Sequence, residues 1–306
     1  MSDCELNEGA GTFVFFDRAA GARQSIRVFY FRPAGPARDA RFVVAMHGLD
    51  RAASVFRDVL INQAEQNGQI VLVPEFDAEA FPDVYSYNYG NVRLAPPSEA
   101  IMPPDLWNFG IIDRLFRHVR TAIGSDRTTF GLFGNSAGSQ FVLRYLALCN
   151  AAAVDRGVAS NCGIYMLPDL TIDYPVGMGG IGLGEGHLRK YLGQPLTILL
   201  GDADTDSAAF DLPRSADAMA QGPHRLARGF WHFDHCRQIA KNLGWRFTGN
   251  WKSLQGPATW INKSSTAPWI FWPTPESAAG RSDLAGSIKA PHHRSHALLR
   301  RRWLAR

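Results

Sequence analysis

The chain has 306 residues, of which 46% are hydrophobic and 20% charged, and this composition argues for a globular protein with one large α/β domain or two modest ones. It argues against a disordered or fibrous chain. The formal net charge is +4, but residues 251–306 alone carry +7, which leaves the first 250 residues at −3. Because the body of the protein is mildly acidic, we do not expect nucleic acid to be a partner.

The cysteines and the N-terminus give no sign of a metal, a disulfide framework or a membrane anchor. Cys4, Cys149, Cys162 and Cys236 lie far apart and lack the spacing of a zinc site. The first residues do not resemble a signal peptide, and no stretch approaches the ~20 apolar residues that span a bilayer. A dinucleotide fingerprint is also missing. We therefore expect a soluble cytoplasmic protein that needs no cofactor.

Six short β-rich runs alternate with helical segments along the chain. The first two have the polar and apolar pattern of a half-exposed antiparallel hairpin, whereas the later four are almost continuously apolar, as strands covered on both faces are. The expected strands are residues 12–16, 25–31, 41–46, 69–74, 128–133 and 196–201. The expected helices are residues 55–67, 108–124, 137–149 and 230–243.

Strands that alternate with helices predict an α/β fold with a mostly parallel sheet. Right-handed crossovers place helices on both faces of such a sheet, and the antiparallel hairpin lies at its leading edge. Two long segments, residues 76–106 and 166–186, have the composition of loops. Loops of that length are usually covers or binding loops, so their tyrosines and apolar residues are candidate walls of a site, although such residues more often pack in the core.

A G-x-S-x-G motif at residues 134–138 lies between an apolar strand and a helical segment, the context in which this motif marks a nucleophile. The sharp turn presents the hydroxyl of Ser136 above the sheet, and only glycines tolerate the crowding on either side. The helix that follows directs backbone N–H groups towards any oxyanion formed there. The alternative interpretation is a Gly-rich turn that simply joins a strand to a helix.

The loop after the strand RFVVAM completes the predicted oxyanion hole. This strand ends at His47-Gly48, and in this architecture the next loop supplies a second backbone N–H to the oxyanion. We predict that Gly48 and the N–H groups of Leu49 and Ala137 form the hole. A lone histidine at such a position is more often structural than a base, so we predict a structural role for His47.

A cluster of carboxylates follows the apolar run LTILLG. A catalytic triad needs a carboxylate that orients its histidine, and in the chain order Ser, acid, His this carboxylate lies C-terminal to Ser136. The G-x-x-D spacing favours Asp204, with Asp202 and Asp206 as alternatives. The remaining alternative is an acidic turn without a catalytic role.

Several stretches in order strengthen this interpretation: VVAMHGLDRAASVFRD, VLVPEFDAEAFPDVYSYNYGNV, LFGNSAGSQFVLRY, ASNCGIYMLPD, LLGDADTD and AQGPHRLARG. Over residues 40–250 the chain resembles the α/β-hydrolase superfamily, and within it bacterial esterases similar to poly(3-hydroxybutyrate) depolymerases. The resemblance implies an α/β-hydrolase fold and a serine hydrolase that cleaves small or oligomeric esters through a Ser-His-Asp mechanism. Asn135 stands where such enzymes often carry histidine, a variable position that leaves the mechanism intact.

The histidine of the triad is not found where the resemblance implies it. Such enzymes carry it in a short G-x-G-H-x loop after the last strand, here around residues 255–262, where the chain reads QGPATWINKSS without a histidine. Substitute candidates are His232 and His235, which precede the last strand, and three histidines of the C-terminal tail. These three are His292, His293 and His296.

Residues 251–306 also differ in composition from the rest of the chain. They hold five of the eight tryptophans and an Arg-rich end, without clear apolar periodicity or capping signals. If the codons for residues 255–261 are read in a frame shifted by two nucleotides, they can encode Gly, a small residue and then Gly-His-Met-Asp. We hypothesise that this segment is translated from a shifted reading frame, and the alternative is a divergent C-terminal extension.

These observations divide the chain into a hydrolase domain, residues 1–250, and an atypical basic, Trp-rich segment, residues 251–306. The function they predict is ester hydrolysis by a serine nucleophile. The alternative is a hydrolase-fold protein that lacks its general base and acts as a binding protein or is a non-productive gene product.

Overall fold

The computed structural model describes residues 5–19, 24–149 and 151–254. The loop expected to carry the catalytic histidine, the three tail histidines and the codons of the hypothesised frameshift all concern residues outside these ranges. No helix in the described part of the chain is both long and apolar enough to cross a bilayer.

Eight strands of the described residues form one sheet in the order β1-β2-β4-β3-β5-β6-β7-β8. The pairs β1–β2 and β2–β4 are antiparallel, and all the other pairs are parallel. The strands are β1 Gly9–Asp17, β2 Gln24–Arg32, β3 Arg41–Met46, β4 Gln69–Pro74, β5 Phe130–Asn135, β6 Val154–Ser160, β7 Leu196–Gly201 and β8 Asn250–Leu254. This topology confirms the expected mostly parallel sheet with an antiparallel N-terminal hairpin.

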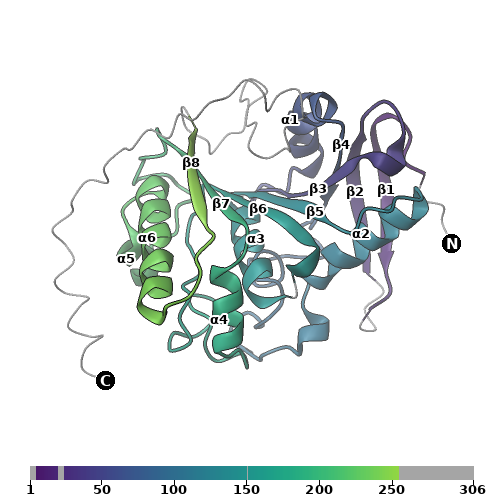
Figure 1. Cartoon of the computed structure of the whole chain (residues 1–306). Helices are drawn as coiled ribbons and strands as arrows, with labels where there is room; N and C mark the ends of the chain where they lie inside the picture. Colours follow the sequence, from purple (N-terminus) through teal and green to yellow (C-terminus); the bar gives the residue numbers. More distant parts are fainter. Residues whose placement is uncertain (1–4, 20–23, 150, 255–306) are drawn as a thin grey trace, which may run out of the picture. The chain divides into compact units, whose positions relative to one another are not determined.

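Helices cover both faces of the sheet, as expected (Figure 1). On one face, α1 packs Ala53, Leu60 and Ala64 against β3 and β4. On the other face, α2, α3, α4 and α6 bury their apolar residues in the larger of the two core clusters. The helices are α1 Ala53–Gln66, α2 Gly110–Ala122, α3 Ala137–Leu148, α4 Glu185–Leu192, α5 Ala216–Gln221 and α6 Arg225–Leu243.

The elements agree with the sequence pattern where that pattern is strong. The apolar stripe of α2 is buried, and α3 is buried along its whole length, as the central helix of the layer. The expected helix at 230–243 is wrong at its start, because α6 begins at Arg225, where the His224 side chain caps it by accepting the N–H of Ala227. The sheet extends to Leu254, so the first four residues of the basic, Trp-rich segment belong to β8.

The sequence pattern misses strand β6 and the two short helices α4 and α5. In β6, the first residue, Val154, is followed by the polar residues Asp155 and Arg156, and the strand ends in Ala159 and Ser160, so it lacks a long apolar run. The small residues have a packing reason, since a Cβ on Gly157 would lie 2.6 Å from Leu146 of α3. β6 pairs with both β5 and β7, and it therefore lies between the strand that precedes Ser136 and the strand that precedes Asp204.

The two long loops are joined to each other and to α3. The Tyr174 hydroxyl donates a hydrogen bond to the carbonyl of Tyr89. Arg144 of α3 is 1% exposed, places its guanidinium 4.3 Å from the ring centre of Tyr89, and donates to the carbonyl of Pro175. Two of the candidate wall residues, Tyr87 and Met166, are fully buried and belong to the core.

Candidate active site

Ser136 occupies a strained turn between the end of β5 and the start of α3. Its backbone has φ 54° and ψ −112°, a positive φ that residues with a side chain rarely adopt. Its side chain is half-buried. Strain of this kind costs on the order of 1–3 kcal/mol and persists only where the surrounding structure enforces it, most often at functional sites. The turn therefore has the geometry of a nucleophile elbow.

The two glycines of the motif enforce the turn through close backbone packing. A Cβ on Gly134 would lie 2.1 Å from the carbonyl oxygen of Gly138. A Cβ on Gly138 would lie 1.9 Å from the carbonyl oxygen of Met46, at the end of β3. The first turn of α3 thus packs directly on the end of β3, which leaves no room for a side chain at either position.

The residues predicted for the oxyanion hole border Ser136 on two sides. Ala137 is the first residue of α3, so its N–H belongs to the helix-start amides that have no intrahelical partner, at the positive end of the helix dipole. Across the turn, a Cβ on Gly48 would lie 4.0 Å from the Cβ of Ser136. Leu49 follows with 46% of its surface exposed. The structure therefore brings Gly48 and Ala137 to the same serine.

His47 has both ring nitrogens engaged in hydrogen bonds. Its Nε2 accepts the N–H of Phe76 at 3.1 Å, which leaves Nδ1 to donate to the carbonyl of Gly48 at 2.9 Å. The ring stacks on Tyr87, and its complete burial lowers the pKa of His47 to about 4. A neutral imidazole with no free nitrogen cannot accept a proton from Ser136, which agrees with the predicted structural role.

Asp204 lies in the loop after β7 and is the buried member of its carboxylate cluster. It is 5% exposed, whereas Asp202 and Asp206 are exposed. Its N–H donates to the carbonyl of Gly201, and its own carbonyl accepts the N–H of Leu226 in the first turn of α6. The loop is therefore held between the end of β7 and the start of α6.

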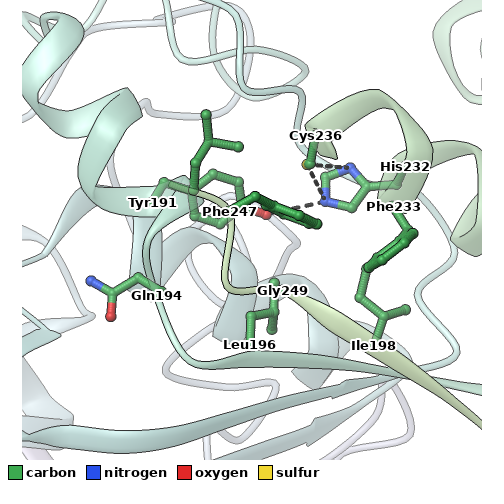
Figure 2. A pocket seen from close by; sticks show the side chains of 10 residues that line it. Tyr191, Gln194, Leu196, Ile198, His232, Phe233, Cys236, Phe247 and Gly249 are labelled. Carbon is green, nitrogen blue, oxygen red and sulfur yellow. Dashed lines mark hydrogen bonds between the residues drawn. The ribbon is translucent and has the colours of Figure 1, made fainter. Parts of the chain in front are cut away.

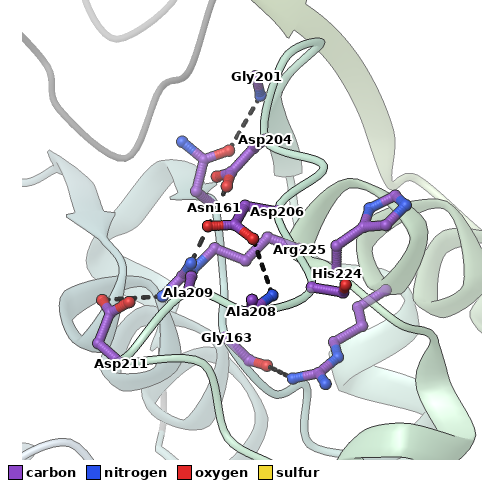
Figure 3. A network of polar contacts seen from close by, with 12 residues as sticks. Asn161, Gly163, Gly201, Asp204, Asp206, Ala208, Ala209, Asp211, His224 and Arg225 are labelled. Carbon is purple, nitrogen blue, oxygen red and sulfur yellow. Dashed lines mark hydrogen bonds and ion pairs between the residues drawn. The ribbon is translucent and has the colours of Figure 1, made fainter.

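A buried arginine that sequence patterns do not single out lies beside this carboxylate (Figure 3). Arg225 is 2% exposed, with Nη1 3.9 Å from Asp204 Oδ1 and Nη2 2.8 Å from Asp211 Oδ2. A carboxylate that becomes buried on folding requires a compensating positive charge. The run of acidic residues after β7 is therefore the only sequence signal that indicates a buried cation such as Arg225.

Strand β8 ends beside the loop that contains Asp204. The N–H of Asp202 donates to the carbonyl of Leu254, the last residue of β8, at 2.9 Å. The end of β8 therefore lies beside the loop that carries Asp204. The sheet order explains this proximity, since β7 and β8 are parallel neighbours whose carboxyl ends meet at one edge.

None of the six histidines in the described ranges forms a hydrogen bond with Ser136. The nearest to the acid is His224, which interacts with both the charge and the backbone of Asp204. Its Nδ1 accepts the N–H of Ala227, which leaves the ring proton on Nε2. In this tautomer, the ring has no unprotonated nitrogen free to act as a base.

His232 and His235, the substitute candidates within the described residues, both lie on α6. His232 is fully buried, stacks on Tyr165, and places Nε2 3.1 Å from the Tyr191 hydroxyl and 3.4 Å from the Cys236 sulfur (Figure 2). Burial lowers the pKa of His232 to about 3. The cavity beside it has a volume of about 10 Å³, space for roughly one water, and neither Ser136 nor Asp204 lines it.

The sheet order and the elbow define the α/β-hydrolase fold, and comparisons with solved structures agree. No family model matches the chain, and no curated protein is significantly similar in sequence. Poly(aspartic acid) hydrolase-1 from Sphingomonas sp. KT-1 is 36% identical with a TM-score of 0.82, over 88% of this chain and 100% of that one. LpqC, a poly(3-hydroxybutyrate) depolymerase from Bordetella parapertussis, is 32% identical with a TM-score of 0.77, over 82% of this chain and 84% of that one.

A more distant structure shares the fold alone: an S-formylglutathione hydrolase from Agrobacterium tumefaciens is 12% identical, with a TM-score of 0.51 over 82% of this chain and 88% of that one. The identity and coverage of the first two matches are high enough to show the family. This chain belongs to the depolymerase-like hydrolases of the α/β-hydrolase fold.

Proposed function

We propose that this protein is a serine hydrolase that cleaves carboxylic esters, with Ser136 as its nucleophile and Asp204 as the acid of its triad. The observation that carries the proposal is the positive φ of Ser136 between two glycines that admit no side chain. A turn that merely joined a strand to a helix would have no need of this strain.

In the proposed mechanism, the Ser136 hydroxyl attacks the ester carbonyl while the N–H groups of Leu49 and Ala137 bind the oxygen that becomes negative. The alcohol leaves, an acyl-serine remains, and water releases the acid. A histidine oriented by Asp204 takes the serine proton and returns it to the leaving alcohol. The chain order Ser, acid, His favours a histidine C-terminal to Asp204.

The names of the two relatives indicate the kind of substrate. One acts on poly(aspartic acid) and the other on poly(3-hydroxybutyrate), so both cleave bonds of a polymer chain. We propose an oligomeric or polymeric ester for this protein. Short nitrophenyl esters are suitable surrogate substrates, because nitrophenolate leaves without a proton from the enzyme.

A fluorophosphonate probe tests the nucleophile directly. We expect covalent labelling of Ser136, identified by peptide mass spectrometry, and its loss in Ser136→Ala. The matched control is Ser139→Ala, because Ser139 lies one turn away and donates its hydroxyl to the Ser136 carbonyl. Labelling that survives Ser136→Ala, or that is missing from the wild-type chain, would contradict the proposal.

A second candidate function is supported by the positions of the histidines. Since His47, His224 and His232 form hydrogen bonds with other groups, a protein without a base would keep the fold and bind ligands without turnover. Loss of a triad base typically costs a factor of about 10⁴ or more in rate. Slow probe labelling together with saturable binding of ester oligomers would favour this second function.

A further inference from the structure

The sheet edge between the nucleophile and the acid contains one residue with an unusual backbone. Asn161 follows the last residue of β6, is 1% exposed and has φ 48°. Asparagine tolerates this left-handed conformation better than most residues do. The regular β6–β7 pairing ends one residue earlier, with Ser160 opposite Leu199.

The side chain of Asn161 accepts the hydrogen bond that its backbone carbonyl would accept in a regular strand pair. Its N–H still donates to the carbonyl of Leu199 at 3.0 Å, as in a regular parallel ladder. The next bond of such a ladder would join the Gly201 N–H to the backbone carbonyl of Asn161. Instead, that N–H donates to the side-chain oxygen Oδ1 at 2.9 Å (Figure 3).

This bond is one link in a series that joins the two predicted catalytic residues. The N–H of Ser136 donates to the carbonyl of Ser160 at 2.9 Å, and Asn161 is the next residue. Gly201, which donates to Asn161, accepts in turn the N–H of Asp204 at 3.1 Å. Of these bonds between the elbow and the acid loop, only the one to Asn161 Oδ1 uses a side chain.

We propose that Asn161 is a positioning residue that sets the spacing between Ser136 and Asp204. This inference rests on the proposed function, because the spacing matters only if these two residues act together. Asn161 is buried beneath the edge and acts through Gly201 rather than through substrate. A displacement of about 1 Å in such an arrangement can cost on the order of a hundredfold in rate, so one hydrogen bond has a measurable effect.

The substitution Asn161→Gly separates the side chain from the backbone conformation. Glycine adopts a positive φ freely, so this variant keeps the turn and removes the acceptor for Gly201, together with the hydrogen bond that Asn161 Nδ2 donates to Ser160 Oγ. Asn91→Gly is the matched control, because Asn91 also has a positive φ, of 57°, and also uses its side chain in one hydrogen bond to the backbone. Melting temperatures of the two variants show whether their losses of stability are comparable.

We expect Asn161→Gly to slow both fluorophosphonate labelling of Ser136 and kcat for a nitrophenyl ester by about ten- to a hundredfold. KM should change less than about twofold, because the residue touches no substrate, and Asn91→Gly should leave both constants close to wild type. Labelling and kcat of Asn161→Gly within about twofold of wild type, or a rise in KM alone, would overturn the proposal.

Amide hydrogen exchange tests the same bond without any need for activity. The amides of Gly201 and Asp204 should exchange faster in Asn161→Gly than in the wild type, and unchanged protection at both would overturn the proposal. If wild-type Ser136 is not labelled at all, the proposed function fails, and the exchange measurement still decides whether Asn161 holds the acid loop.

Discussion

The glycine at position 138 illustrates how tightly the nucleophile turn is built. A Cβ there would meet the backbone of Met46 and His47, which cannot rotate away. We expect Gly138→Ala to lower the free energy of unfolding by about 3 kcal/mol, at the upper end of overpacking effects, and to slow labelling of Ser136. Urea denaturation measures the first effect and probe labelling the second.

A second helical glycine provides the control for this substitution. Gly186 of α4 has no atom within 4 Å of an added Cβ, so Gly186→Ala should stabilise the protein by about 0.5–1 kcal/mol through the helix propensity of alanine. Equal effects at the two positions would show that the contact with β3 does not restrict the turn.

His47 makes the stability of the protein depend on pH. Its folded pKa of about 4 lies below the unfolded value of 6.5, so between these values the unfolded chain binds more protons than the folded one. The free energy of unfolding should therefore fall as the pH drops from about 7 to 4, with a contribution from His47 of about 3 kcal/mol. Burial of His232 acts in the same direction.

Denaturation at several pH values tests this contribution. In His47→Gln, the loss of stability between pH 7 and pH 4 should be smaller than in the wild type by about 3 kcal/mol. His187→Gln removes an exposed histidine and should keep the wild-type dependence. A His47→Gln variant with an unchanged pH dependence would mean that folding does not lower the pKa of His47.

At the scale of elements, one buried ion pair ties α2 to the edge strand β1. Arg114 donates from Nε and Nη2 to the two carboxylate oxygens of Asp17, at 2.8 Å and 2.7 Å, and the Asp17 side chain is 5% exposed. Arg114→Met leaves this carboxylate buried without its partner and should cost about 3 kcal/mol in unfolding experiments.

The exposed pair between Arg38 and Asp126 is the matched control for that substitution. Because their side chains are 62% and 93% exposed, Arg38→Met should change stability by less than about 1 kcal/mol. The double variant Asp17→Asn/Arg114→Met should regain part of the loss, since no charge remains buried. A loss in Arg114→Met no larger than in Arg38→Met would exclude a stabilising role for the buried pair.

Arg144 should control the stability of both long loops at once. Its guanidinium contacts Tyr89 of the first loop and the carbonyl of Pro175 in the second. In Arg144→Met, we expect thermolysin to cleave several-fold faster within both residues 76–106 and residues 166–186. Without the Arg144 contacts, less free energy is needed to open either loop locally. Faster cleavage in one loop alone would show that the loops open independently.

At the scale of the whole molecule, the segment that follows β8 is the part of the chain in which we expect the general base. The carbonyl of Leu254, the last residue of β8, accepts the N–H of Asp202, which lies two positions before Asp204 in the chain. We predict that replacing residues 255–306 with the corresponding segment of a relative, or with the segment encoded by the shifted frame, raises kcat for ester hydrolysis by about 10³–10⁴-fold.

The controls for this exchange are the native chain and the same chimera with its new histidine changed to alanine. Resequencing the gene across codons 240–270 tests the frameshift hypothesis independently, because a frame that encodes Gly-x-Gly-His would explain the composition of the tail. A chimera that binds the probe no faster than the native chain would show that this segment is not the source of the base.

Local patterns were sufficient for much of the fold. Local constraints that act over a few residues are visible in the sequence. They account for the apolar runs of β3, β4, β5 and β7, for the stripe of α2 and for the glycines around Ser136. The choice of Asp204 over its two neighbours, made there on spacing alone, accords with its burial, although its role stays a prediction.

Features that depend on distant pairing could not be read in the same way. β6 has small residues only because α3 lies against it, Arg225 is needed only because the fold buries Asp204, and Asn161 gains its partner only when β6 lies beside β7. Each involves residues about 10 to 40 positions apart that meet when the strands pair. A short stretch of sequence contains only one of the two residues in such a contact, and only the folded structure shows which residue is its partner.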